Sequence, residues 1–396
     1  MRKRVAATVF LTACLLGCPH AAPAPRDETV DLVVIAPHPD DEVLMAGGVL
    51  EQAVKAGRRA AVIVLTNGDL GCFDDRDGAL RQAETVSALA ALGLDEDAVH
   101  FLGYPDGHLA RLGATPLREV DWRAPDGTCA TRRTTLATRG AGHLDEHTRR
   151  TGRPAPFTAP ALTGDLAALL ERLAPRDVYL PHGLDEHPDH AATYLFFRRA
   201  LARLVRGPVT VHRAVVHAGP CWPTDCATSL APDEPLPELP APFDGYRPTE
   251  RVPIEGRRKL ALIAHYASQA PGGAERDWLA GFARRDEAFF TETLRRDASG
   301  RWTTVEAERT GELPIAEGAT VSLESGATLA VAVTDSSVTL HADGRVVARW
   351  ERIGAQPPFS LRVTTRRDAN GYAEWSLWGA GEFAGTRVLR GFPRGG

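Results

Sequence analysis

The sequence predicts an α/β protein, with a Rossmann-like, mainly parallel sheet covered by helices on both faces and a small all-β, sandwich-like domain after it. Over residues 31–298, continuous apolar runs such as 32–36 and 60–65 alternate with segments of helical spacing. Such runs are typical of strands buried on both faces, and the alternation is typical of a parallel sheet. After about residue 299 the chain changes to short strand-like runs separated by turn residues, which is typical of an antiparallel sandwich.

Length and composition fit two folded domains. The chain has 396 residues, 43% hydrophobic and 24% charged, so it can bury a core and is neither disordered nor a multi-span membrane protein. Its 46 basic and 51 acidic residues give a net charge of −5, so the composition lacks the excess of basic residues that is typical of nucleic-acid-binding proteins. We place the main domain at residues 31–298 and a β-rich accessory domain at 299–396.

The elements of the main domain follow in a regular order. Strands are predicted over residues 32–36, 60–65, 99–102, 177–180 and 209–216, and helices over 44–56, 80–92, 166–173, 191–205, 257–267 and 278–294. The first two helices are each followed by a glycine, a common helix terminator. Residues 108–160 and 219–256 show no clear period and interrupt this order as long loops.

The N-terminus predicts export. Basic residues 2–4 precede an apolar stretch too short to span a bilayer comfortably, so residues 1–17 are interpreted as a signal peptide. The stretch ends in Leu-Leu-Gly-Cys, which resembles the lipobox of bacterial lipoproteins; the alternative is a plain signal cleaved near residues 21–24. We expect an exported lipoprotein on the periplasmic or cell-surface side, lipidated at Cys18, with residues 18–30 as a tether and the lipid as its only membrane anchor.

Export also changes the meaning of the remaining cysteines. An oxidising compartment favours disulfides, and the tight paired spacings of a cysteine metal site are absent. Cys221 and Cys226 would close a small loop, which leaves Cys72 to pair with Cys129, although four cysteines allow three pairings.

Polar residues follow the first predicted strand directly, in the run Pro-His-Pro-Asp-Asp-Glu over residues 37–42. In a doubly wound sheet, ligands bind beyond the carboxyl ends of the strands, where this run would lie. His38 and Asp41 are three residues apart around a helix start, so both can face one point, with Asp40 between them. The ordinary alternative for the two aspartates is a helix N-cap with favourable dipole charge.

A second cluster follows the strand over residues 177–180 and contains His187 and His190, again three apart at a helix start. If the two strands are neighbours, His38, Asp41 and His190 complete a two-histidine, one-carboxylate metal site with open positions. A single pair of histidines at this spacing is more often incidental, but two such clusters at strand ends favour a metal site.

The spare residues then have natural roles. Asp40, beside a metal ligand, is the candidate general base. His187 is the candidate imidazolium that stabilises a developing oxyanion and protonates the leaving amine. Asp189 would orient or charge His187, as carboxylates do for catalytic imidazoles.

Residues 37–42 together with 187–190 resemble the two signature motifs of the LmbE-like (PIG-L) N-acetylglucosaminyl deacetylase family. The similarity spans about residues 31–293. It implies a Rossmann-like fold, a metal that is usually zinc, and the ligand and base roles given above.

The resemblance also implies that Arg81 and Asp106 contact a sugar hydroxyl or phosphate. The alternatives are an intrahelical partnership of Arg81 with Glu84 and a plain turn at Asp106. The function expected is removal of acetyl from an N-acetylated amino sugar in an exported glycan, glycolipid or glycoside, with one divalent metal, Zn²⁺ or Fe²⁺. The alternatives are an O-acetyl ester deacetylase on the same scaffold and a catalytically silent glycan-binding surface lipoprotein.

Overall fold

The computed structural model describes most of residues 28–296 and, after them, the strands of the C-terminal part. Within 28–296 the residues not described are 71–76, 125–126, 137–138, 140–141, 184, 205–206, 219–221, 225–230, 241–247 and 270–277. The signal peptide and Cys18 lie outside the described residues, as do Cys72, Cys221 and Cys226, so export, lipidation and the pairing of Cys129 stay predictions. Among the described helices, none has the length and apolar character needed to cross a bilayer.

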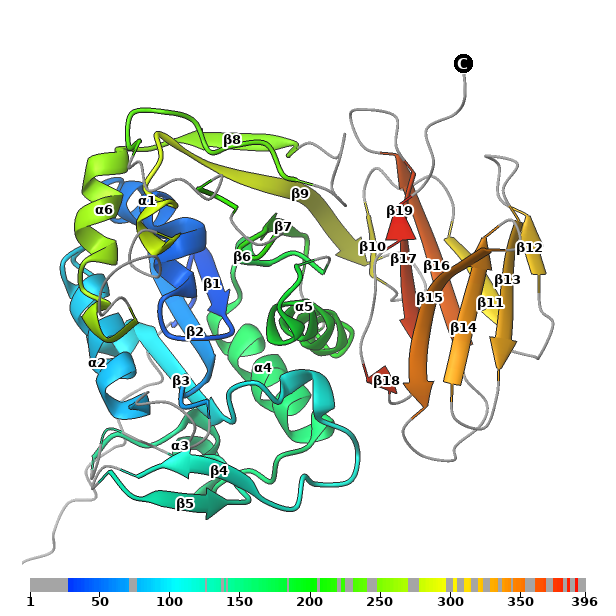
Figure 1. The fold of residues 1–396 in the computed structure, drawn as a ribbon, viewed down its shortest axis with the longest axis horizontal. Coiled ribbons are helices and arrows are strands. Elements are labelled where there is room, and N and C mark those ends of the chain that lie inside the picture. Colours follow the sequence, from blue (N-terminus) through cyan, green and yellow to red (C-terminus); the bar gives the residue numbers. More distant parts are fainter. Residues whose placement is uncertain are drawn as a thin grey trace, which may run out of the picture.

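The main sheet has the strand order β10-β9-β7-β6-β1-β2-β3, with β8 added to β9 (Figure 1). Neighbours from β7 to β3 run parallel, and β8, β9 and β10 pair antiparallel. The strands are β1 (Leu32–Ala36), β2 (Ala60–Thr66), β3 (Val99–Tyr104), β6 (Asp177–Pro181), β7 (Val209–Ala214), β8 (Glu250–Pro253), β9 (Asp286–Arg296) and β10 (Trp302–Thr304). The predicted mainly parallel sheet is confirmed.

Helices cover both faces of this sheet. Leu32, Val34 and Ala36 of β1 pack into one core with α1, α2 and α6, whereas Val33 and Ile35 pack into a second core with α4 and α5. All of β1 is buried, which is why its sequence is one continuous apolar run. The helices are α1 (Asp41–Lys55), α2 (Gly78–Ala90), α3 (Glu146–Thr151), α4 (Ala159–Leu173), α5 (Pro188–Leu201) and α6 (Gly256–Ile263).

The chain reverses its direction across the sheet between β1 and β6. It runs outward from β1 through β2 to β3, and later returns to the other side of β1 with β6 and β7. The register pairs Leu32 with Asp177 and Val34 with Tyr179, so the turns that follow β1 and β6 lie side by side. Such a switch point is where doubly wound sheets bind ligands.

One predicted element is wrong. Residues 278–294 were expected to be helical, but β9 is an 11-residue strand that pairs with β7. Buried Glu292 and Leu294 alternate with half-buried Thr291 and Thr293, which is the period of a strand. The spacing of apolar residues in this stretch is compatible with a helix or a strand. The strand forms because it can pair with the otherwise unpaired edge of β7.

The regions outside the layers also have defined structure. In the predicted long loop over residues 108–160, β4 (Val120–Arg123) and β5 (Cys129–Arg132) form an antiparallel pair. The C-terminal part forms two further antiparallel sheets, β11-β16-β17-β19 and β12-β13-β14-β15-β18. Their strands are β11 (Thr310–Pro314), β12 (Thr320–Ser322), β13 (Thr328–Val333), β14 (Ser337–Ala342), β15 (Arg345–Arg352), β16 (Ser360–Arg367), β17 (Ala373–Gly379), β18 (Phe383–Ala384) and β19 (Leu389–Arg390). Because β10 pairs with β9, the main sheet continues past residue 298.

A buried ion pair bridges a break in α1. The backbone leaves helical geometry at Ala46, where φ is −140° and ψ is 22°. Lys259 donates from Nζ to the carbonyl of Leu44 and to Glu287, both at 2.7 Å. Glu287 accepts the N–H groups of Gly48 and Val49 at 2.8 and 3.0 Å. The pair therefore supplies partners on both sides of the break, as capping residues do at helix ends.

Replacing Glu287 with Gln should destabilise the fold by about 3–5 kcal/mol, because it leaves the Lys259 ammonium buried without a counter-charge. Urea unfolding at neutral pH measures this change. The control is Asp233→Asn, which breaks an ion pair with Arg257 whose side chains are 74% and 77% exposed; its cost should stay below about 1 kcal/mol. Equal small losses in both variants would contradict the role given to the buried pair.

Candidate active site

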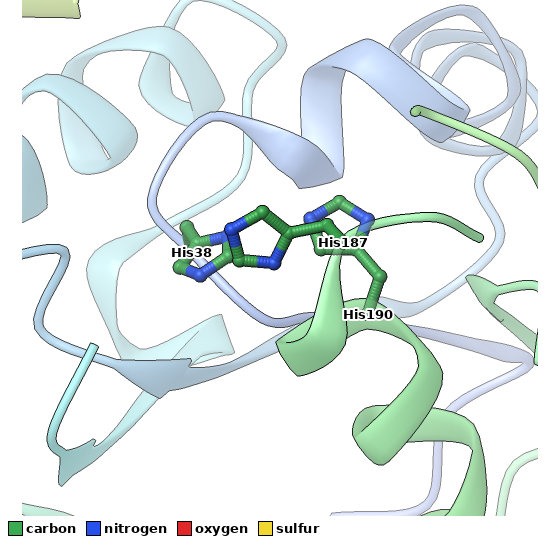
Figure 2. Close-up of side chains that lie close together, drawn as sticks. All are labelled: His38, His187 and His190. Carbon is green, nitrogen blue, oxygen red and sulfur yellow. The ribbon is translucent and has the colours of Figure 1, made fainter. Parts of the chain in front are cut away.

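The turn after β1 brings His38 and Asp41 together. Oδ2 of Asp41 accepts the backbone N–H of His38 at 3.1 Å and lies 3.0 Å from its Nδ1. The same oxygen is 3.1 Å from Nε2 of His190 in α5. The rings of His38 and His190 lie together in Figure 2, with centroids 5.3 Å apart. The two clusters identified in the sequence thus converge on one carboxylate oxygen.

The local sequence fixes how α5 begins. His187 is its N-cap, and Nδ1 of that ring accepts the backbone N–H of Asp189 at 3.2 Å. Pro188 takes the first helical position, where its missing N–H costs nothing. The three-residue spacing puts His190 on the same side of the helix as His187, with ring centroids 4.9 Å apart (Figure 2).

One ring nitrogen each of His38, His187 and His190 lies within 4.8 Å of the other two, close enough together to hold a metal ion. Nδ1 of His38, Oδ2 of Asp41 and Nε2 of His190 are the nitrogen and carboxylate donors that zinc takes in proteins. His190 is fully buried, and although its Nε2 and Nδ1 lie 3.1 and 3.4 Å from carboxylate oxygens, neither nitrogen makes a hydrogen bond among the described residues. Buried polar atoms in this state are costly unless something else satisfies them, and a metal ion would do so for Nε2.

Carboxylates stand behind both candidate histidine ligands. Nε2 of His38 lies 3.0 Å from Asp106, and Nδ1 of His190 lies 3.4 Å from Asp185. A carboxylate beside the far nitrogen of a ligating histidine orients the ring and raises its basicity. Asp185 is itself fixed, because it accepts the backbone N–H groups of His187 and Val216.

Buried charges of both signs balance each other in this cluster. Burial disfavours the imidazolium of His38, but Asp106 and the other carboxylates outweigh it and raise its pKa well above the usual value. Burial likewise opposes charge on His190, and Asp41 and Asp185 raise its pKa to about 10. Burial acts to raise the pKa of Asp41, but the facing imidazoles of His190 and His38 outweigh it and hold that pKa well below its usual range. The buried carboxylates therefore stabilise positive charge at this point of the site.

Asp40 is held in a strained conformation. Its φ of 129° is unusual for any residue but glycine, and such strain occurs at functional sites where neighbours enforce it. Glu42 accepts its backbone N–H at 3.1 Å, and the hydroxyl of Tyr266 donates to Glu42 at 2.5 Å. Burial raises the pKa of Asp40 to about 7, opposed by the guanidinium of Arg81, which donates to its Oδ2 at 3.1 Å.

Arg81 and Asp106 lie inside this network and not on an open surface. Arg81 is 3% exposed and donates to the carbonyls of Gly68 and Pro39 as well as to Asp40. Asp106 is 4% exposed and lies against His38 and Arg81. The alternative partner of Arg81, Glu84, instead accepts from Ser268. Both residues organise the site, and their contact with substrate stays a prediction.

The relation expected between Asp189 and His187 is wrong. The Asp189 carboxylate accepts the N–H groups of Gly107 and Leu109 at 2.7 and 2.9 Å and lies 3.4 Å from Nε2 of His38. It meets His187 through its backbone N–H, because it belongs to the first turn of the helix that His187 caps. Asp189 therefore braces His38 and the turn after β3.

The state expected for His187 also needs correction. Because Nδ1 accepts a backbone N–H, the ring proton lies on Nε2 and the imidazole is neutral. Burial and the neighbouring imidazoles of His38, His190 and His217 lower its pKa to about 3. His187 is thus a neutral Nε2–H donor, suited to an oxyanion and not to the predicted imidazolium role.

Residues 33–201 match the family described as GlcNAc-PI de-N-acetylase (PIG-L). This domain belongs to the PIG-L family. The matched residues include every candidate ligand of the metal site and the strained Asp40.

Two curated relatives carry the name 1D-myo-inositol 2-acetamido-2-deoxy-alpha-D-glucopyranoside deacetylase. The protein of Mycobacterium sp. (strain KMS) is 32% identical over 186 residues, which are 43% of this chain and 50% of the relative. That of Mycolicibacterium gilvum (strain PYR-GCK) is 30% identical over 181 residues, 42% and 52% of the two chains. The chain spans about half the length of the curated relatives it matches.

Parts of this chain are also similar to solved structures. The N,N'-diacetylchitobiose deacetylase of Pyrococcus horikoshii is 16% identical, with 66% of this chain and 82% of that chain covered and a TM-score of 0.42. A conserved protein of Thermus thermophilus is 24% identical, with 62% and 82% covered and a TM-score of 0.37. At these scores the similarities do not bear on activity.

Two further residues, Tyr266 and His217, complete the site, and of these His217 was not singled out in the sequence. Tyr266 holds Glu42, and Glu42 holds Asp40. His217 follows β7, and its ring lies 4.6 Å from that of His190. Because β7 is the parallel neighbour of β6, the rule that ligands bind beyond strand ends could have identified His217 once the strand order was known.

We expect the protein to purify with one divalent metal per chain, and His190→Ala to lose it, because the variant removes one of the three candidate ligands. Asp185→Asn removes the charge behind His190 and should weaken metal affinity about 10–100-fold. Elemental analysis and competition with a chelator measure both. Asp95→Asn, at an exposed loop carboxylate, is the control. Full metal content in the His190→Ala protein would refute this ligand set.

Proposed function

We propose that the chain is a metal-dependent hydrolase that removes the acetyl group from an N-acetylated amino sugar. One observation carries the proposal: a two-histidine, one-carboxylate donor set and a second buried carboxylate, Asp40, meet at the switch point of a PIG-L domain. The names of the curated relatives, deacetylases of an acetamido sugar, support the substrate class. The activity of the whole protein belongs to the proposal.

His38, Asp41 and His190 would hold the metal, which we propose to be zinc. A divalent cation at this place supplies a Lewis acid that polarises the acetamide carbonyl. Asp106 and Asp185 keep the two imidazoles oriented from behind.

Asp40 would move the proton. Arg81 holds Oδ2 of Asp40, which leaves Oδ1 to accept a proton from the attacking water. The new carbon–oxygen bond forms as the carbonyl oxygen becomes negative, and the Nε2–H of His187 donates to that oxygen. Asp40 then returns the proton to the nitrogen as the carbon–nitrogen bond breaks, so that a free amine and acetic acid leave, and the acid ionises to acetate in water.

The setting of the reaction is a further part of the proposal. A signal over residues 1–17 and lipidation at Cys18 would place the domain outside the cytoplasm on a membrane surface, and its substrate would be an exported glycan, glycolipid or glycoside. This part rests on the sequence of the N-terminus alone. Globomycin treatment followed by a search for uncleaved precursor tests it.

Asp40→Asn should lower the rate of acetate release by about 10²–10⁴-fold while the metal content stays near that of the parent protein, because an amide cannot accept the proton. The assay offers N-acetylglucosamine glycosides and, in parallel, O-acetylated sugars, with elemental analysis of the same samples. Asp95→Asn serves as the matched control. Full activity of Asp40→Asn would overturn the base assignment, and release from the O-acetyl esters alone would overturn the amide substrate.

A further inference from the structure

Two buried imidazole nitrogens remain unsatisfied once the proposed metal is assigned its ligands. A cation held by Nε2 of His190 leaves Nδ1 of the same ring, which makes no hydrogen bond among the described residues. Nδ1 of His217 is likewise buried without a hydrogen bond in the part of the chain that the structure describes. The two nitrogens face one carboxylate: Nδ1 of His190 lies 3.4 Å from Oδ2 of Asp185, and Nδ1 of His217 lies 3.4 Å from its Oδ1.

Asp185 cannot satisfy both nitrogens by accepting hydrogen bonds from them. An ionised carboxylate offers about four lone-pair sites. Backbone N–H groups use three of these sites, because that of His187 donates to Oδ1 and those of Val216 and His217 donate to Oδ2. One site, on Oδ1, is left for two imidazoles. A cation bound to that oxygen and to both ring nitrogens would satisfy all three groups at once.

The distances and the donor types suit a divalent cation such as Zn²⁺. Tetrahedral zinc with bonds of about 2.0–2.1 Å holds its donor atoms about 3.3–3.4 Å apart. Both distances to Asp185 have this length, and one donor atom each of Asp185, His190 and His217 lies within 4.8 Å of the other two. Two imidazoles and one carboxylate favour zinc over magnesium or calcium, which prefer oxygen ligands.

We propose that Asp185, His190 and His217 form a second cation site, which binds a divalent ion of the zinc type behind the metal of the proposed reaction. His190 bridges the two ions, with Nε2 on the first and Nδ1 on the second. Binding of the second ion releases the Nδ1 proton to solvent, as metal binding does at protonated ligands. The inference goes beyond the proposed function and shares with it the ligand His190.

The test counts the ions that the full-length protein binds. Protein stripped of metal is titrated with Zn²⁺ against a coloured competing chelator, which reports the number of ions and their affinities. The parent should bind two ions, the second more weakly because two cations share one imidazole, so that the protein as purified keeps the first. His217→Phe keeps a ring but removes a ligand of the second ion, and it should bind one. His190→Ala should lose both.

His143→Phe changes a histidine whose side chain is 45% exposed, and this control should still bind two ions. Thermal melting confirms folding, and His217→Leu replaces His217→Phe if that variant melts early. Saturation of the parent at one ion, or a second ion retained without His217, overturns the inference. Two ions in the parent and one in the His217 variant, with no acetate released from any substrate, refute the proposed function and support the second cation site.

Discussion

The site depends on one carboxylate oxygen, Oδ2 of Asp41, which lies within 3.1 Å of a nitrogen of both His38 and His190. These two histidines are far apart in the chain, and only the pairing of β1 with β6 brings them together. That pairing is parallel, so the turns after both strands emerge at the same edge of the sheet. A one-strand change in the order would move α5 away from α1 and leave no common point.

Convergence of this kind buries charges that would be costly alone. His38, Asp41, Asp106, Asp189 and His190 are all at most 7% exposed. The free-energy cost of desolvating each group is offset in two ways: carboxylates and imidazoles alternate through the cluster, and backbone N–H groups of the turn after β3 donate to Asp189. Removing one charge therefore affects groups that it does not touch, and for this reason the supporting carboxylates matter as much as the ligands.

The sequence allowed much of this to be predicted, and the limits have physical causes. The buried strands and the two strand-end clusters are local patterns, so the convergence of the candidate ligands could be predicted from spacing and from the strand-end rule. The helix expected over residues 278–294 failed because β9 is selected by the open edge of β7, which no local pattern reveals. The partner of Asp189 was likewise non-local: its carboxylate meets Gly107 and His38, while the nearby His187 meets only its backbone.

The chain beyond the matched residues 33–201 completes the geometry within them. Glu287 and Lys259 bridge the break in α1, whose first turn carries Asp41. Tyr266, from the segment after α6, fixes Glu42 and through it the strained backbone of Asp40. Strain at a residue persists only where neighbours over-determine its conformation. The position of the candidate base thus depends on contacts from the segment after α6 as well as on its own turn. A fragment that ends at α5 would contain both sequence motifs but would lack the contacts that hold Asp40 in its conformation.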